Sequence, residues 1–202
     1  MATIHCALGA YPRLTMAEVS IKDAESADEL QLVRNLLSEY VAEQQEALLA
    51  AGAVLARLEA ITSHSRGVSR NLDTSPGPYA PPEGCLLLAT LGDEPAGCVA
   101  LKRVDPARCE MKRLYIRPQF RRRGVGRQLT LAVMESAVNL GYQYMRLDTV
   151  AVLEPAPALY RSLGFHPIEP FDPAPGWLKG GMLAFELRLN KDAAEARAND
   201  HC

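Results

Sequence analysis

The stretch FRRRGVGR, at residues 120–127, places four arginines around two glycines that flank a valine. Arginine carries a permanent charge on a planar fork of N–H donors, a geometry that matches phosphate. Glycine has no Cβ, so its backbone can come close to a ligand. Three interpretations fit the stretch taken alone: a solvated run of charge, a patch for nucleic acid, or a cradle for phosphate.

The charge of the whole chain argues against a general binder of polyanions. Lysine and arginine number 22 against 24 aspartates and glutamates, which gives a formal net charge of −2 over 202 residues. Nucleic-acid-binding domains usually carry a basic surface. The arginines are therefore a local concentration, and we expect no nucleic-acid partner.

The arginine–glycine turn joins a predicted strand to a predicted helix. CEMKRLYI (109–116) has the composition of a strand that Pro118 ends, and alternation predicts two faces, one with Glu110, Lys112, Leu114 and Ile116 and the other with Met111, Arg113 and Tyr115. Apolar residues then recur with helical spacing from 125 to 140, and Gly141 suits a left-handed helix end. The first amides of a helix lack internal partners and carry the positive end of its dipole, so this turn is a candidate anion cradle.

The remaining segments alternate between strand and helix. Ser26 and Glu29 form a capping box before a helix over about 27–43, and a second helical stretch follows with its apolar face over 47–61. Prolines exclude a long regular element from the loop at 63–84. Strands are expected at 19–21, 85–91, 96–104, 144–150, 165–168 and 182–189, with a short helix over about 158–163.

This order of elements predicts an α/β fold, a single domain with a mixed, mostly antiparallel sheet flanked by helices. Strands that follow helices favour some parallel pairing, whereas the hairpin around the turn GDEP (92–95) imposes antiparallel pairing. The domain is expected to cover 17–190, between a loosely ordered arm at 1–16 and a frayed tail at 191–202.

The cysteines and histidines show no metal-binding pattern. Five cysteines and four histidines are scattered, without C-x-x-C or mixed ligand spacing, which favours a reducing cytoplasm. No apolar run approaches the roughly 18 residues of a membrane helix, and the N-terminus does not resemble a secretion signal. We expect a cytoplasmic protein with no metal and no membrane partner.

Two motifs resemble those of the GNAT superfamily of N-acetyltransferases. Arg121, Gly124 and Gly126 match its signature of Gln or Arg, two residues, Gly, one residue, and Gly or Ala. ALYRSLGFHP (158–167) is similar to a second motif, a helix that carries a tyrosine and is followed by Gly-Phe. The resemblance covers roughly 19–189, is most specific over 84–165, and points to small bacterial enzymes of poorly defined substrate.

The resemblance implies that the cradle binds the pyrophosphate of acetyl-CoA. The turn residues that it assigns to the cofactor are Arg121, Arg122, Arg123, Gly124, Val125, Gly126 and Arg127, and the strand residues are Leu114, Tyr115 and Ile116, whose backbone would meet the pantetheine amides.

The same resemblance assigns two catalytic roles. Tyr160 would be the general acid that protonates the departing CoA thiolate. Glu110 lies fourteen residues before Gly124, the position of the base in the histone-acetylating branch, and would remove a proton directly or through water. From the residues alone, Tyr160 also fits a core aromatic and Glu110 a structural carboxylate.

One position departs from the pattern of the superfamily. Many members have an asparagine seven residues before the tyrosine, where it contacts the cofactor, whereas this chain has Leu153. Pro155 and Pro157 follow closely, so the helix that carries Tyr160 is expected to be short.

The residues and the resemblance together predict an acetyl-CoA-dependent N-acetyltransferase that transfers the acetyl group directly to an amine. We expect a small amine or an amino-acid-like molecule as the acceptor, and a protein amine is the second candidate. The alternatives are a non-catalytic acyl-CoA-binding or regulatory module and, third, a nucleic-acid-binding protein. The sequence leaves a homodimer open.

Overall fold

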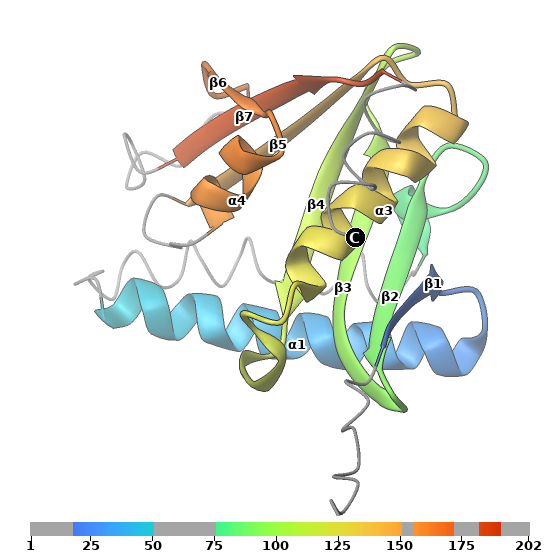
Figure 1. Cartoon of the computed structure of the whole chain (residues 1–202), viewed down its shortest axis with the longest axis vertical. Helices are drawn as coiled ribbons and strands as arrows, with labels where there is room; N and C mark the ends of the chain where they lie inside the picture. Colours follow the sequence, from blue (N-terminus) through green and yellow to red (C-terminus); the bar gives the residue numbers. More distant parts are fainter. Residues whose placement is uncertain (1–17, 51–75, 151–155, 172–181, 191–202) are drawn as a thin grey trace, which may run out of the picture.

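A seven-stranded sheet forms the centre of the computed structural model, which describes residues 18–50, 76–150, 156–171 and 182–190 (Figure 1). The strand order is β1-β2-β3-β4-β5-β7-β6. The strands are β1 (Val19–Asp23), β2 (Cys85–Leu91), β3 (Glu94–Arg103), β4 (Arg108–Ile116), β5 (Tyr144–Val150), β6 (His166–Ile168) and β7 (Met182–Arg188). Of the six neighbouring pairs, five are antiparallel and the β4–β5 pair is parallel. The predicted mixed, mostly antiparallel α/β fold is confirmed.

Helices cover both faces of this sheet (Figure 1). The helices α3 (Val125–Asn139) and α4 (Ala156–Ser162) contribute to one apolar core, together with Met145 and Phe185 of the sheet. The long helix α1 (Ala27–Ala50) packs on the other face, over a second core that includes Leu88 and Tyr115. Two short 3-10 segments, η1 (Gly77–Tyr79) and η2 (Pro118–Phe120), precede β2 and α3.

Most predicted elements have their expected positions, including the short α4 and the left-handed Gly141 after α3, with φ +86°. The hairpin turn is tighter than expected. Gly92 and Asp93 alone form it, with φ +61° at Gly92, so that Glu94 and Pro95 belong to β3.

The capping box at the start of α1 is confirmed. Ser26 Oγ accepts a hydrogen bond from the Glu29 amide at 3.2 Å, and Glu29 Oε2 accepts one from the Ser26 amide at 2.9 Å. Lys22 Nζ lies 2.5 Å from Glu29 Oε1. These contacts satisfy amides that have no partner inside the helix and fix where α1 begins.

The predicted end of this helix near residue 43 is wrong, because α1 continues to Ala50. No glycine or proline lies between the start of α1 at Ala27 and Gly52, so no residue of this stretch ends the helix earlier. The predicted second helix therefore overlaps α1 at its start, and its remainder lies outside the described residues. The arm at 1–16, Leu153 and the tail at 191–202 also lie outside them.

A β-bulge interrupts the alternation of β4. Cys98 of β3 faces Tyr115 and Ala100 faces Lys112, so two residues of β4 lie opposite one residue of β3. Arg113, at the bulge, has a left-handed φ of +61°. Such a conformation costs roughly 1–2 kcal/mol for a residue with a Cβ.

Contacts of Arg113 with η1 offset this strain. The Arg113 Nε donates to the Tyr79 hydroxyl at 2.8 Å, and the guanidinium lies 5.4 Å from the centre of the same ring. Cys98 Sγ lies 3.8 Å from the Arg113 carbonyl oxygen.

The bulge overturns the predicted faces of β4. Glu110 and Lys112 point to the α1 side, opposite Cys109 and Met111, which belong to the α3 core. Beyond the bulge Tyr115 takes the α1 side, while Leu114 and Ile116 pack against the α3 core. The prediction that Glu110, Lys112, Leu114 and Ile116 share one face is therefore wrong, because strict alternation assumes that no extra residue is inserted.

The strands β4 and β5 pair over three residues and then diverge (Figure 1). The pairing runs from Arg108 opposite Tyr144 to Glu110 opposite Arg146. Within the described part of the chain, the backbone of residues 111–116 has no strand partner on the β5 side. Side chains engage two carbonyls of this segment, that of Arg113 through Cys98 and that of Ile116 through Arg121, and the other peptide groups on the β5 side are open to a partner.

Replacing Glu29 by glutamine should destabilise the protein in a pH-dependent way. The pKa of Glu29 falls from 4.5 to about 2, chiefly through Lys22 and then through the Ser26 amide. A lowered carboxyl pKa stabilises the folded state fully above about pH 4.5, and this stabilisation is lost as the pH falls toward about 2. Urea unfolding of wild type and Glu29→Gln should therefore differ at neutral pH, and the difference in unfolding free energy should shrink below about pH 4.5.

Asp28→Asn is the matched control, because it removes the same charge from the same turn of α1. We expect a smaller and less pH-dependent loss for it. A Glu29→Gln difference that stays constant with pH would contradict the assignment.

Candidate functional site

The arginine–glycine turn leads from η2 into α3 and keeps its backbone donors free. Gly124 is the N-cap of α3 with φ +79°, a conformation that glycine adopts without strain. The amide of Gln128 donates to the Gly124 carbonyl at 3.0 Å, but the amides of residues 122–127 have no backbone acceptor among the described residues. Unpaired amides at the positive end of a helix attract anions. This is the geometry that the cradle interpretation requires.

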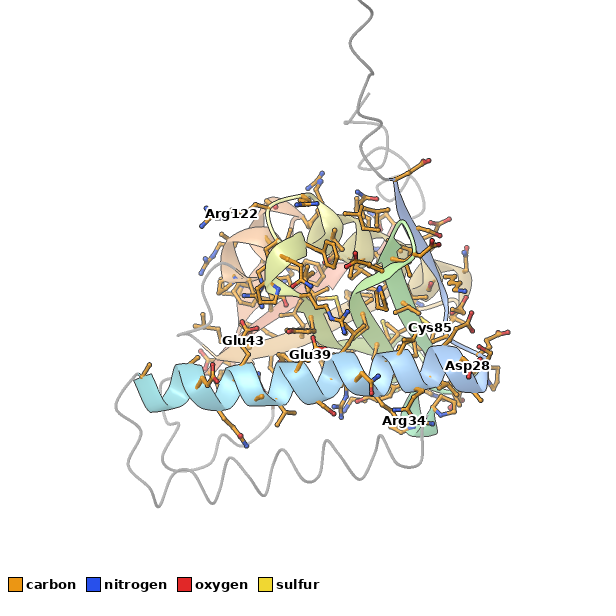
Figure 2. All side chains as sticks on the ribbon, turned by 90° about the horizontal axis from the view of Figure 1, so that it is seen from below. Asp28, Arg34, Glu39, Glu43, Cys85 and Arg122 are labelled. Atoms are coloured by element: carbon orange, nitrogen blue, oxygen red, sulfur yellow. The ribbon has the colours of Figure 1, made fainter. Side chains whose placement is uncertain are left out.

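Two arginines of this region bind Glu39 and Glu43 of α1, the two glutamates labelled on this helix in Figure 2. Arg121 Nη2 lies 2.7 and 2.6 Å from the two carboxylate oxygens of Glu43, and its Nε donates to the Ile116 carbonyl at 2.9 Å. Arg117 donates from Nε and Nη2 to the two oxygens of Glu39 at 2.9 and 2.7 Å. The two pairs fasten the turn to α1.

The four arginines of the turn therefore do not share one role. The guanidinium of Arg121 is engaged by Glu43, so in this structure it is not among the side chains free for phosphate. Arg122 and Arg123 are exposed, and Arg127 is half-buried. These three side chains, together with the turn amides, remain the predicted phosphate ligands.

Gly126 lies where α3, β4 and α4 meet. A Cβ at this position would lie 3.1 Å from Ile116 Cδ1 and 3.7 Å from Leu159 Cδ2. Leu159 directly precedes Tyr160 in α4. The glycine thus lets the start of α3 approach both the end of β4 and the helix of the predicted acid.

Tyr160 is buried beside this junction. Its ring centre lies 5.9 Å from that of Phe165 and 6.0 Å from that of Phe185. Burial raises the pKa of Tyr160 above its ordinary value, and Tyr40 and Asp148 raise it further. The hydroxyl therefore stays protonated at neutral pH and can act as a hydrogen-bond donor.

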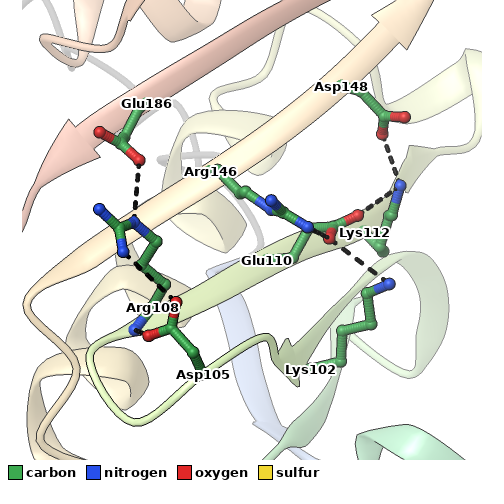
Figure 3. A network of polar contacts seen from close by, with 8 residues as sticks. All are labelled: Lys102, Asp105, Arg108, Glu110, Lys112, Arg146, Asp148 and Glu186. Carbon is green, nitrogen blue, oxygen red and sulfur yellow. Dashed lines mark hydrogen bonds and ion pairs between the residues drawn. The ribbon is translucent and has the colours of Figure 1, made fainter. Parts of the chain in front are cut away.

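Glu110 is fully buried and lies among three cations (Figure 3). Lys112 Nζ lies 2.6 Å from its Oε1, Lys102 Nζ lies 3.4 Å from its Oε2, and Arg146 Nη2 donates to Oε2 at 3.0 Å. Burial acts to raise the pKa of Glu110, but Lys112, Lys102 and Arg146 outweigh it and lower the pKa overall. The carboxylate is ionised at neutral pH and is a weak base.

Lys112 connects this carboxylate to β5. Its Nζ also lies 2.6 Å from Asp148 Oδ1, beyond the last backbone pair between β4 and β5. Burial acts to lower the pKa of Lys112, but Asp148 and Glu110 raise it overall, so this lysine is a cation and no nucleophile. The charge of Asp148 adds to the effect of burial in raising the pKa of Tyr160.

The structure thus brings the turn, Leu114–Ile116 and α4 together, whereas Glu110 lies nearer the other end of β4. Six strand positions separate Glu110 from Ile116, about 20 Å of extended chain. Three members of the network, Lys102, Arg146 and Asp148, were not predicted from the sequence. The signal for Asp148 was a carboxylate in the middle of the apolar strand YMRLDTV.

The described ranges contain neither a metal-binding cluster nor a membrane-spanning helix. No group of three or more histidine, cysteine, aspartate or glutamate residues there could hold a metal ion. The helices of the same ranges include none with the length and apolar character to cross a membrane.

A family model described as "Acetyltransferase (GNAT) family" matches residues 36–165. Over 95 residues the chain is 43% identical to an uncharacterized N-acetyltransferase of Schizosaccharomyces pombe, a segment that covers 46% of this chain and 58% of that protein. Over 89 residues it is 36% identical to the N-acetylaspartate synthetase of Danio rerio, covering 43% of this chain and 32% of that protein. The chain thus matches less than two thirds of the length of these relatives.

The fold also matches solved structures. The PaiA N-acetyltransferase of Thermoplasma acidophilum, solved in complex with coenzyme A, superposes with a TM-score of 0.62 at 17% identity. The match covers 85% of this chain and 99% of that chain. At this identity the likeness concerns the fold.

Substitution of Glu110 by glutamine should cost stability. Removing one partner of a buried ion pair leaves the others uncompensated, which typically costs about 3–5 kcal/mol, and the partial exposure of the cations favours the lower end of that range. Chemical denaturation should show a loss of about 3 kcal/mol for Glu110→Gln.

Glu83→Gln is the control, because Glu83 forms a more exposed ion pair with Arg103. Such pairs contribute about 0–1 kcal/mol. Equal stability of the two variants would show that the Glu110 network is not a structural requirement.

Proposed function

The chain belongs to the GNAT family of acetyltransferases, and we propose on this basis that it transfers the acetyl group of acetyl-CoA to an amine. The observation that carries the proposal is the junction at Gly126. There a turn with free amides lies directly beside a strand edge that β5 leaves unpaired. A diphosphate and an extended chain of amides would fit these two features side by side.

In the proposed complex, the amides of residues 122–127 bind the pyrophosphate of acetyl-CoA, and Arg122, Arg123 and Arg127 add positive charge. The side chain of Arg121 holds the turn against α1 and its amide donates to the Pro118 carbonyl at 3.2 Å, so Arg121 supports the cradle rather than binding phosphate. Leu114, Tyr115 and Ile116 offer their backbone groups to the pantetheine arm, as an added strand would be bound. Coenzyme A bound to the Thermoplasma acidophilum protein of the same fold supports this assignment.

Acetyl-CoA supplies an activated acetyl group as a thioester. The nitrogen of the acceptor forms a bond to the acetyl carbon, the bond to sulfur breaks, and the electron pair leaves with the thiolate. Tyr160 donates a hydrogen bond to this sulfur. Burial raises the pKa of Tyr160 further above about 8.5, the ordinary value for a thiol, so the hydroxyl stabilises the thiolate by its hydrogen bond and passes a proton to sulfur only as the proton released by the acetylated nitrogen replaces it.

The acceptor must lose a proton, because an amine with a pKa of about 10.4 is an ammonium at neutral pH. Glu110 is the proposed base. Its lowered pKa and its three cationic neighbours favour relay of the proton through water over direct abstraction. A small amine or amino-acid-like molecule is the proposed acceptor, and the name of the related N-acetylaspartate synthetase supports an amino acid.

Gly126→Glu should abolish tight binding of acetyl-CoA, because it places a negative charge where the pyrophosphate is proposed to lie. A side chain at this position also crowds Ile116 and Leu159, so Gly126→Gln is needed as a control of nearly equal shape. Calorimetry on both folded variants isolates the charge. Equal dissociation constants for the two would remove the pyrophosphate from this turn.

Tyr160→Phe should leave the fold and the affinity for acetyl-CoA intact and lower kcat by about 10²–10⁴-fold, the usual range for a lost general acid. Raising the pH should not restore the rate, since deprotonating the amine does not replace the hydroxyl.

Tyr142→Phe is the matched control, because this buried tyrosine donates a hydrogen bond to the Glu83 carbonyl at 2.7 Å, outside the proposed site. It should lose roughly 1 kcal/mol of stability and no activity. Wild-type turnover in Tyr160→Phe would exclude the tyrosine from the mechanism. Tight acetyl-CoA binding without CoA release from any amine would select a non-catalytic acyl-CoA-binding module.

A further inference from the structure

Three cations surround the carboxylate of Glu110 (Figure 3) and are more exposed than it is. Lys102, Lys112 and Arg146 come from three adjacent strands, on the face of the sheet that α1 partly covers. Their side chains are 32, 23 and 21% exposed, whereas that of Glu110 is 0% exposed. Asp148 is 18% exposed, so a molecule that approaches this face meets three cations and one carboxylate.

The charges of the network are distributed unevenly. Lys102, Lys112 and Arg146 face Glu110 and Asp148, so this inner group has one positive charge in excess. The eight residues of Figure 3 balance in total, because Arg108 lies 3.3 Å from Asp105 and 3.6 Å from Glu186 in an outer group. The excess of positive charge therefore belongs to the inner group, where β4 and β5 separate.

Each cation of the inner group keeps donors that its partners do not use. Lys112 directs Nζ at two carboxylates and has a third proton. Arg146 uses Nε and Nη2 on Glu110, which leaves Nη1 without a partner among the described residues, and its guanidinium lies 3.8 Å from the centre of the Phe171 ring. Lys102 has the longest contact with Glu110, 3.4 Å. These donors suit one further carboxylate.

Asp148 would determine how an acceptor is oriented at these cations. Only its Oδ1 is in contact with Lys112 within the described network, and its charge acts on both Tyr40 and Tyr160. Asp148 lies two residues beyond Arg146, the last residue of β5 that pairs with β4, so among the inner group it reaches, together with Lys112, furthest into the gap between these strands. An acceptor whose carboxylate meets the cations can direct its ammonium group toward Asp148 and the thioester.

We propose that the acceptor is an amine that also carries a carboxylate, an amino acid or a close analogue, and that Lys102 and Arg146 bind this carboxylate while Asp148 faces the amine. This inference rests on the proposed function. In this arrangement Glu110 faces the carboxylate end of the acceptor, so it acts as a positioning residue that holds the three cations in place, and Asp148 replaces it as the carboxylate nearest the amine.

The test compares CoA release from L-amino acids with release from the corresponding amides, which keep the amine and the side chain but lose the negative charge. The amine of an amide resembles a peptide N-terminus, with a pKa of about 7.7–8.0, so more of it is uncharged at neutral pH and reactivity alone favours the amide. We expect kcat/KM to be about 10- to 100-fold higher for at least one acid than for its amide, in line with the loss of a charged hydrogen bond.

Lys102→Met should remove most of this preference by raising KM for the acid, with little change for the amide or for acetyl-CoA. Arg103→Met is the matched control, because it removes a cation from the next position of β3. Arg103 pairs with Glu83 and not with Glu110. It should keep the preference. Thermal melting of both variants verifies the fold.

The outcomes separate this inference from the proposed function. Turnover that is equal for acids and amides, or that is fastest with a lysine-containing peptide, would overturn the inference and leave the acetyltransferase in place. A Lys102→Met defect of equal size on both members of a pair would also overturn it. No CoA release from any amine, with acetyl-CoA bound, would instead overturn the proposed function itself.

Discussion

Ion pairs take over from backbone hydrogen bonds at the point where β4 and β5 separate, and the rest of the site depends on this exchange. The last backbone pair joins Glu110 to Arg146, and the side chains of the same two residues are bonded to each other. One step further, Lys112 and Asp148 hold the strands through their side chains alone. The fully buried carboxylate of Glu110 is stable only with its cationic partners in place, so the network has to form as a unit. Because the network ties β4 to β5 where their backbone pairing ends, the two strands can diverge beyond this point while the sheet stays intact.

The long helix α1 braces the other end of the gap. Glu39 and Glu43 are one helical turn apart and so lie on the same side of α1, where they bind Arg117 and Arg121 (Figure 2). A turn built on glycine would otherwise have considerable backbone freedom. The arginines of the turn thus have two different functions. Arg121 fixes the turn to α1, and the exposed arginines supply positive charge.

Local rules predicted the elements of this fold but not the relations between distant ones. Apolar periodicity located the strands and α3, and the capping box located the start of α1, because these signals lie within a few residues of one another. The bond between Arg121 and Glu43 spans 78 positions, and no local pattern of charge indicates it. The faces of β4 were mispredicted for a related reason, because the left-handed Arg113 is stabilised by Tyr79, which is remote in sequence. The roles proposed for Glu110 and Tyr160 came from resemblance. The environment that lowers the pKa of Glu110 includes Lys102 and Arg146 from neighbouring strands.

The bulge at Arg113 divides β4 into two halves that can change separately. Before it, side chains at 110 and 112 face the α1 side, and after it, side chains at 114 and 116 face the α3 core. Substitutions in the first half would alter the polar network without disturbing the edge proposed for the cofactor. Deleting one residue between the halves would instead disturb the edge proposed for the cofactor, because the side chains of all later residues in β4 would switch to the opposite face of the sheet. New acceptor specificities can therefore evolve on this fold by substitution of residues in β4. Insertion or deletion at the centre of the strand would damage the proposed cofactor edge.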